Sequence, residues 1–86
     1  MKVTFHKKFT KNYQKLPMKI KESVNSRMML FSINPTSSIL RIHKLKGGLK
    51  DRFSMNVGGD MRIQYRYVTK HEVMLTNIGT HSELYE

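Results

Sequence analysis

Two stretches of alternating side chains, joined by a pair of glycines, constrain the fold of this chain more than any other feature. In residues 52–57 and again in residues 61–68, apolar side chains alternate with polar or basic ones, and Gly58 and Gly59 lie between the two stretches. Alternation with a period of two is typical of strands, and a two-glycine connection is typical of a hairpin turn. The pattern therefore predicts a hairpin with one apolar face and one cationic face, the latter carrying Arg52, Ser54, Asn56, Arg62, Gln64 and Arg66.

The first part of the chain changes from strand-like to helical spacing. Residues 2–5 alternate as a short strand would, and apolar side chains then recur every three or four residues in two stretches. The spacing predicts a helix over residues 7–16, which Pro17 ends, and a second helix that starts at this proline and stops at Asn34 and Pro35. The apolar positions of the two helices are Phe9, Tyr13, Leu16, Ile20, Val24, Met28 and Phe31.

The remaining segments complete a small α+β domain that spans residues 1–86. Residues 39–43 are predicted to be extended, Gly47 and Gly48 to form a turn, and residues 72–78 to form a last strand after a turn near residues 69–71. The predicted order is βααβββ. An antiparallel sheet whose apolar face is covered by the helical hairpin is the simplest way to bury these stripes, and it leaves the cationic face open.

The charge balance indicates a negatively charged partner. The chain has 16 lysines and arginines against 6 aspartates and glutamates, a formal net charge of +10. Such an imbalance favours binding to a nucleic acid, to an acidic protein, or to both. Cysteine is absent, and the sequence contains neither the apolar stretch of a signal peptide nor one of a membrane span, so we expect a cytoplasmic protein that does not enter a membrane.

Several side chains in the second half of the chain suit proton transfer on a phosphodiester. Cleavage of RNA without a metal requires a base for the ribose 2′-OH, an acid for the leaving 5′-oxygen, and a cation that holds the phosphate. His81, in a loop predicted just beyond the last strand, is the candidate acid, and Arg62 is the candidate phosphate clamp. His43 and Asp60 are candidates for a second proton-transfer group, although an exposed loop histidine and a turn aspartate are common without any such role. The histidines are too scattered to predict a metal site, and no cofactor motif is present.

Three segments carry a resemblance to a known group of proteins. Residues 43–47 read HKLKG, residues 59–65 read GDMRIQY, and residues 78–85 read IGTHSELY. Together they resemble toxins of the RelE/ParE superfamily, most closely the YafQ-like messenger-RNA interferases. The resemblance extends over nearly the whole chain, including the N-terminal helical hairpin.

The resemblance implies a function, partners and residue roles. It implies a toxin of a bacterial type II toxin–antitoxin system that cuts messenger RNA in the A site of the 70S ribosome, without metal or cofactor, by attack of the 2′-OH. It also implies a cognate acidic antitoxin as partner. The implied catalytic residues are His81, Asp60, His43 and Arg62. The implied RNA-binding residues are Lys44, Lys46, Lys50, Arg52, Asn56, Arg66 and Tyr85.

Two departures from the pattern keep other functions open. Asn56 stands where the YafQ-like pattern has a histidine, and Asn77 stands where many relatives have an arginine; Met61 also replaces an aromatic residue. The same superfamily includes gyrase poisons of the ParE type, which share the scaffold. A gyrase poison and a catalytically decayed RNA-binding toxin homologue are therefore the alternatives to an active endoribonuclease.

Overall fold

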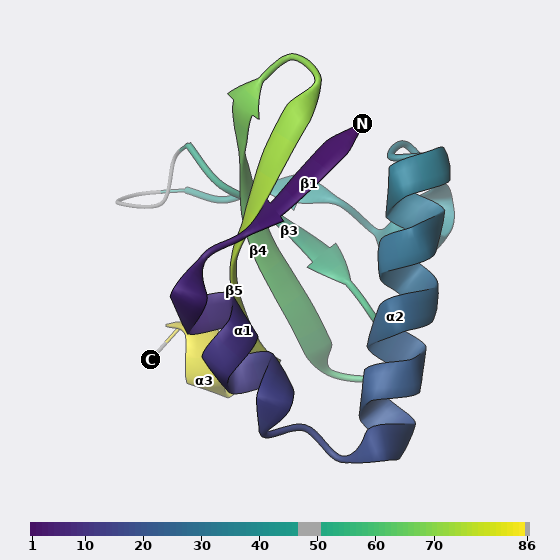
Figure 1. Cartoon of the computed structure of the whole chain (residues 1–86), viewed down its shortest axis with the longest axis vertical. Helices are drawn as coiled ribbons and strands as arrows, with labels where there is room; N and C mark the ends of the chain where they lie inside the picture. Colours follow the sequence, from purple (N-terminus) through teal and green to yellow (C-terminus); the bar gives the residue numbers. More distant parts are fainter. Residues whose placement is uncertain (47–50, 86) are drawn as a thin grey trace.

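The computed structural model describes residues 1–46 and 51–85 and arranges them in two layers (Figure 1). The chain order is β1 (Lys2–Phe5), α1 (Lys7–Gln14), α2 (Met18–Ile33), a 3-10 turn (Ser38–Leu40), β2 (His43–Lys44), β3 (Phe53–Asn56), β4 (Met61–Thr69), β5 (Glu72–Thr80) and α3 (His81–Tyr85). The α+β class, the two helices and the hairpin of β3 and β4 are confirmed. The turn predicted at Gly47 and Gly48 lies outside the described residues.

The sheet is mixed rather than antiparallel. Its strand order is β1-β5-β4-β3-β2 across the described residues. Strand β1 lies parallel to β5, with Val3 opposite Val73, while the other neighbours are antiparallel. The prediction of a purely antiparallel sheet was wrong for β1, because the alternation that identifies a strand contains no information about the direction of its partner.

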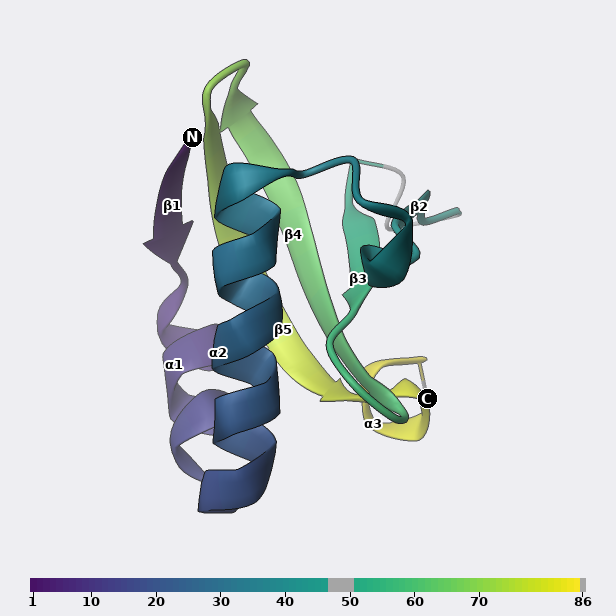
Figure 2. The same cartoon turned by 90° about the vertical axis from the view of Figure 1, so that its right-hand side faces the viewer.

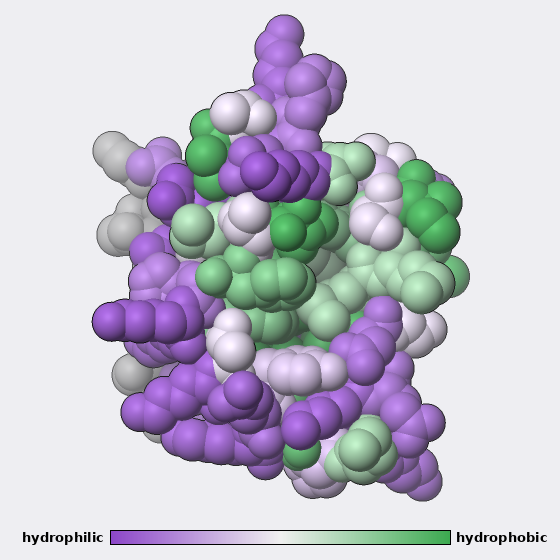
Figure 3. Space-filling model, in the orientation of Figure 1, coloured by the Kyte–Doolittle hydropathy of each residue, from purple (hydrophilic) through white to green (hydrophobic). Residues whose placement is uncertain are grey.

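Helices α1 and α2 cover one face of the sheet, as expected from their apolar stripes (Figure 2). The core between the layers includes Val24 and Phe31 from α2 and Met55, Ile63 and Tyr65 from the hairpin, all at most 1% exposed. The ring of Tyr65 meets that of Phe31 edge to face with 5.0 Å between centroids, and burial raises the pKa of its phenol above the ordinary value. The α1–α2 side still presents apolar side chains at its surface (Figure 3).

The segment after α2 departs from the predicted extended conformation. Residues Ser38–Leu40 form a 3-10 turn, started by a bond from the amide of Ile39 to the hydroxyl of Ser37 (3.4 Å). Arg41 then adopts a left-handed conformation with φ of 47°. Strand β2 consequently contains only His43 and Lys44. Leu40 explains this turn, because its fully buried side chain belongs to the core.

The sequence had suggested that the second face of the sheet is open, but two of its polar side chains are buried. Ser54 is 0% exposed and Gln64 is 3% exposed. Helix α3 folds back over this face, opposite α1 and α2 (Figure 2), and a Cβ on Gly79 would lie 3.1 Å from Oε1 of Glu83. Within residues 1–46 and 51–85, no helix is long and apolar enough to cross a membrane.

Candidate active site

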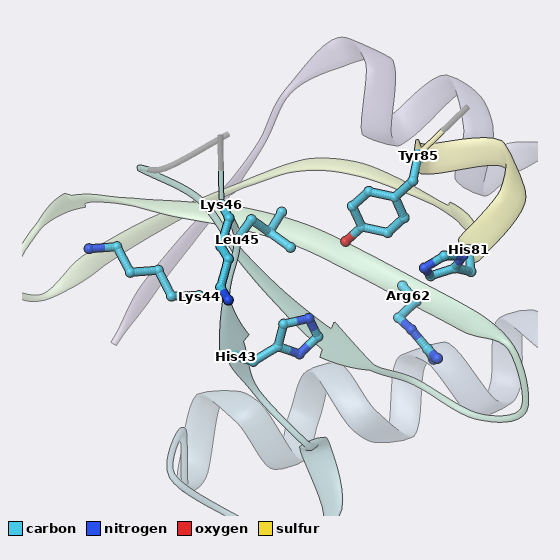
Figure 4. Close-up of a pocket in the computed structure, with 7 residues that line it drawn as sticks. All are labelled: His43, Lys44, Leu45, Lys46, Arg62, His81 and Tyr85. Atoms are coloured by element: carbon cyan, nitrogen blue, oxygen red, sulfur yellow. The ribbon is translucent and has the colours of Figure 1, made fainter. Parts of the chain in front are cut away.

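A cavity of about 440 Å³ lies on the face of the sheet that α3 approaches (Figure 4). It is lined by His43, Lys44, Leu45, Lys46, Arg62, His81 and Tyr85. These residues come from the β2 segment, the start of β4 and helix α3, which are far apart in the sequence. The lining contains two imidazoles, a guanidinium, a phenol and two ammonium groups but no carboxylate, so the cavity suits an anionic ligand.

The strand register explains why His43 reaches this cavity. His43 lies opposite Ser54 on β3, Ser54 lies opposite Gln64 on β4, and Gln64 lies opposite Asn77 on β5. Residues directly opposite each other on neighbouring strands point to the same face of a sheet. A row of polar side chains therefore crosses β2, β3 and β4, while Asn77, where the β5 register shifts, accepts a bond from Asn12 of α1 instead. His43 is at the exposed end of this row, with Nδ1 3.4 Å from the carbonyl oxygen of Arg41.

His81 begins helix α3 rather than lying in a loop. The amide of Thr80 donates to Oε1 of Glu83 (2.7 Å), and the amide of Glu83 donates to the hydroxyl of Thr80 (3.3 Å). This reciprocal pair is a capping box, which satisfies amides that a helix start leaves unpaired. Hydrogen bonding to Thr80, first to its backbone amide and then to its side chain, holds the pKa of the Glu83 carboxyl below its ordinary value. The stabilisation of α3 by this carboxylate is present at neutral pH and is lost as Glu83 becomes protonated at low pH.

The helical spacing of α3 brings His81 and Tyr85 together. Side chains four residues apart lie on the same side of a helix, and the two rings are 4.7 Å apart between centroids. Figure 4 shows both rings on the same side of the cavity as Arg62. The position of the imidazole therefore depends on how α3 docks against the sheet.

Gly79 permits this docking, and we predict that a side chain there displaces α3. A Cβ at residue 79 would meet Glu83 at 3.1 and 3.3 Å and Leu84 at 3.4 Å, which is too close for the branched side chain of valine. We expect Gly79→Val to move His81 and Tyr85 while the remaining core stays folded. Two-dimensional NMR spectra would show shift changes concentrated in residues 79–85. Spectra in which the signals of α3 coincide with those of the original protein would contradict the prediction.

Arg62 lines the cavity from the start of β4. Its register partners are Asn56 on β3 and Gly79 on β5. Nη2 lies 4.0 Å from Oδ1 of Asp60, with 25% of the Arg62 side chain and 61% of the Asp60 side chain exposed. A pair this long and this accessible to water holds the guanidinium weakly. Nη1 is buried without a hydrogen-bond partner among the described residues.

The cavity unites some of the residues that the sequence singled out and leaves others outside. His43, Lys44, Lys46, Arg62, His81 and Tyr85 line it. Asp60 lies at the hairpin end of β4 and reaches the site only through Arg62. Lys50 lies outside the described residues. Arg52 and Arg66 do not line the cavity; Arg66 lies opposite Met74, farther along β4.

The side chain of Asn56 is engaged in the hairpin turn. Its Nδ2 donates to the carbonyl oxygen of Gly59 (3.1 Å), and its Oδ1 accepts from the amide of Gly58 (3.0 Å). Both glycines have positive φ, 117° and 52°, so the turn needs residues without a Cβ. Asn56 thus stabilises the turn next to the cavity, which is a reason for an asparagine at this position.

Sequence reasoning missed Leu45 as a lining residue. It is 8% exposed and lies between two lysines that line the same cavity. A single leucine within the basic segment HKLKG was the available signal, because an apolar residue two positions from His43 on an extended chain shares its face. Among residues 1–46 and 51–85, no three histidine, aspartate or glutamate side chains lie close enough to hold a metal ion.

The comparisons with known proteins agree with the fold. The model of the family described as bacterial toxin of type II toxin–antitoxin system, YafQ, matches residues 1–86. No curated protein sequence matches the chain significantly.

Solved structures of similar proteins cover nearly the whole chain. YafQ from Escherichia coli BL21(DE3) is 19% identical with a TM-score of 0.82, over 98% of this chain and 97% of that one. A conserved hypothetical protein from Helicobacter pylori is 28% identical with a TM-score of 0.69, over 99% of both chains. YoeB in the YoeB–YefM toxin–antitoxin complex from Staphylococcus aureus is 20% identical with a TM-score of 0.73, over 94% of this chain and 97% of that one.

Proposed function

The chain belongs to the YafQ family of bacterial type II toxins, and from this membership we propose that it is an endoribonuclease that cuts messenger RNA. The observation that carries the proposal is the cavity that holds His43, Arg62, His81 and Tyr85 together without a carboxylate. Proton-transfer groups and a guanidinium in one cationic cavity are what metal-independent cleavage of a phosphodiester requires.

In the proposed reaction the 2′-oxygen forms a bond to phosphorus as the bond from phosphorus to the 5′-oxygen breaks. His43 accepts the proton of the 2′-OH, and His81 donates a proton to the leaving 5′-oxygen. The products are a 2′,3′-cyclic phosphate and a free 5′-OH. Arg62 holds the phosphate through its planar guanidinium, which grips two oxygens at once.

Of the two candidate bases, His43 fits the cavity better than Asp60. The imidazole of His43 lines the cavity, whereas Asp60 lines a separate hollow formed by α2 and the hairpin end. Asp60 is 4.0 Å from the guanidinium of Arg62. Its proposed contribution is therefore indirect, through its weak ion pair with Arg62, which holds the phosphate.

The proposed substrate and partners follow from charge and from the family. The messenger RNA in the 70S A site is the proposed substrate, so the protein acts in the cytoplasm. The net charge of +10 favours both RNA and an acidic antitoxin. The structure of YoeB with YefM supports an antitoxin partner for this chain. Apolar side chains exposed on the α1–α2 side, Phe5, Met18, Met29 and Ile33, offer a protein partner further surface.

Expression in bacterial cells from a tightly controlled promoter tests this function. We expect growth arrest together with new 5′ ends at fixed codon positions in translated messenger RNA, mapped by primer extension. The cuts should persist with His71→Ala, a change at an exposed histidine in the β4–β5 turn, and vanish with His81→Ala. Growth arrest with intact RNA and broken DNA would assign a gyrase poison instead, and the absence of arrest would assign a decayed toxin homologue.

A further inference from the structure

Four polar atoms are buried without any hydrogen-bond partner among the described residues. They are Oγ of Ser54, Nη1 of Arg62, Nε2 of Gln64 and Oη of Tyr85. Most buried polar groups in folded proteins are paired, and an unpaired one costs free energy that an apolar side chain of the same shape would not. Such groups need an explanation beyond the stability of this chain.

The four atoms belong to one region of the molecule. Ser54 lies directly opposite Gln64 on the neighbouring strand, and Arg62 lies two residues before Gln64 on the same face of β4. Tyr85 shares the cavity with Arg62, and Figure 4 shows its ring projecting over strand β4. The unpaired atoms therefore lie on the sheet face that carries the proposed active site. Ser54 and Gln64 do not line the cavity itself and form a neutral polar floor next to Arg62.

The chemistry of this floor differs from that of the cavity above it. The lining is rich in cations, which suit the phosphates of an RNA strand. A carboxamide and a hydroxyl are neutral and offer both donors and acceptors, as does the edge of a nucleobase, whereas a phosphate diester offers acceptors alone. Unpaired RNA bases are recognised in this way, by hydrogen bonds to their edges and by stacking on aromatic rings.

We propose that Gln64 and Ser54 form a base-reading subsite beside the scissile phosphate, which the ring of Tyr85 covers in the free protein. The subsite rests on the proposed function and deepens it by assigning the residues that select the base. Entry of a nucleotide moves the Tyr85 ring aside. The base then pairs with the carboxamide of Gln64 and the hydroxyl of Ser54, while Arg62 holds the adjoining phosphate.

Binding measured in a His81→Ala background tests the subsite, because RNA then stays intact whether or not the parent protein cleaves it. Fluorescence anisotropy would give the Kd of four short labelled oligoribonucleotides that differ in one base. We expect the background protein to discriminate among them, and Gln64→Leu and Ser54→Ala to reduce that discrimination by about tenfold. Both changes should leave the melting temperature unchanged or raise it, since each removes an unpaired buried group.

Thr76→Val is the matched control. The Thr76 hydroxyl is also buried in the sheet, but it donates to the carbonyl oxygen of Gln64 at 3.0 Å. Removing it should lower the melting temperature and leave base discrimination unaltered. Gln64→Glu keeps the shape of the side chain and exchanges a donor for an acceptor, so it should change which base is preferred.

The proposal is overturned if the background protein binds all four oligoribonucleotides equally. It is also overturned if Gln64→Leu and Ser54→Ala leave the ratios of the four Kd values unchanged. It is also overturned if these changes destabilise the protein as Thr76→Val does without altering the ratios, because the groups then act in folding alone. Absence of RNA cleavage by the unmodified protein, with the ratios changed as expected, would instead refute the proposed nuclease and retain the subsite.

Discussion

Replacing His81 with alanine is expected to lower the rate of RNA cleavage by about 10²–10⁴-fold, the usual contribution of a positioned general acid or base. The imidazole lies at the start of α3 and lines the cavity beside Arg62 and Tyr85. Its side chain is exposed and its ring packs against that of Tyr85 at the surface of the cavity, so the fold should tolerate its loss. Single-turnover cleavage of a translated messenger RNA on purified ribosomes would measure the rate.

Two controls separate a chemical role of His81 from an effect on structure. His71→Ala, at the far end of the β4–β5 hairpin, should leave the rate unchanged. The melting temperature of His81→Ala should stay close to that of the original protein, since exposed side chains contribute little to stability. A rate within threefold of the original would remove His81 from the proposed mechanism, in which general-acid catalysis contributes at least about 10².

The local part of the fold was predictable from the sequence. Apolar residues such as Phe9, Val24 and Phe31 recur with helical spacing, and they are buried in the core as expected. The hairpin followed from alternation around Gly58 and Gly59, whose positive φ values the turn requires. Each of these signals depends on residues that are close together in the chain.

Most of the features that the sequence analysis missed depend on contacts between residues far apart in the chain. The parallel pairing of β1 with β5 joins residues about 70 positions apart, and no local pattern indicates its direction. Ser54 and Gln64 are buried, whereas alternation indicates only which face a side chain occupies and not what covers that face. Helix α3 is five residues long; Thr80 and Glu83 have capping-box spacing, and that local signal was overlooked.

The candidate site was predictable in its residue types and less so in its geometry. His43, Arg62, His81 and Tyr85 meet in one cavity, although the sequence separates them by up to about 40 residues. Asp60 was grouped with them because the family resemblance implied a catalytic aspartate there, yet in the structure it lines another hollow. Asn56 was expected to face RNA, and its amide is bonded to the turn. Roles inferred from a family pattern thus still require the register of the strands.

Replacing Arg62 is expected to have the second-largest effect on cleavage. Arg62→Ala should lower the rate by about 10²–10³-fold, as does the loss of one group that stabilises developing charge. Arg62→Lys keeps the charge but loses the planar pair of donors, so its cleavage rate should fall between that of the original protein and that of Arg62→Ala. Loss of the ion pair with Asp60 should cost less than about 1 kcal/mol of stability, because the contact is long and the Asp60 side chain is exposed. Cleavage rates and denaturant unfolding of both variants would measure these effects.

Arg66→Ala is the matched control for Arg62→Ala. Arg66 lies on the same strand and face, four residues away, and does not line the cavity. Arg66→Ala removes the same charge as Arg62→Ala, so it should weaken RNA binding at low salt. The difference in RNA affinity from the original protein should disappear as added salt screens the phosphates. The loss in Arg62→Ala should instead remain in the cleavage step at saturating substrate, because a phosphate clamp acts on the charge that develops in the transition state. If Arg62→Ala and Arg66→Ala lowered the cleavage rate equally at saturating substrate, Arg62 would contribute only its net charge. The proposed phosphate clamp would then have to be another cationic residue of the cavity.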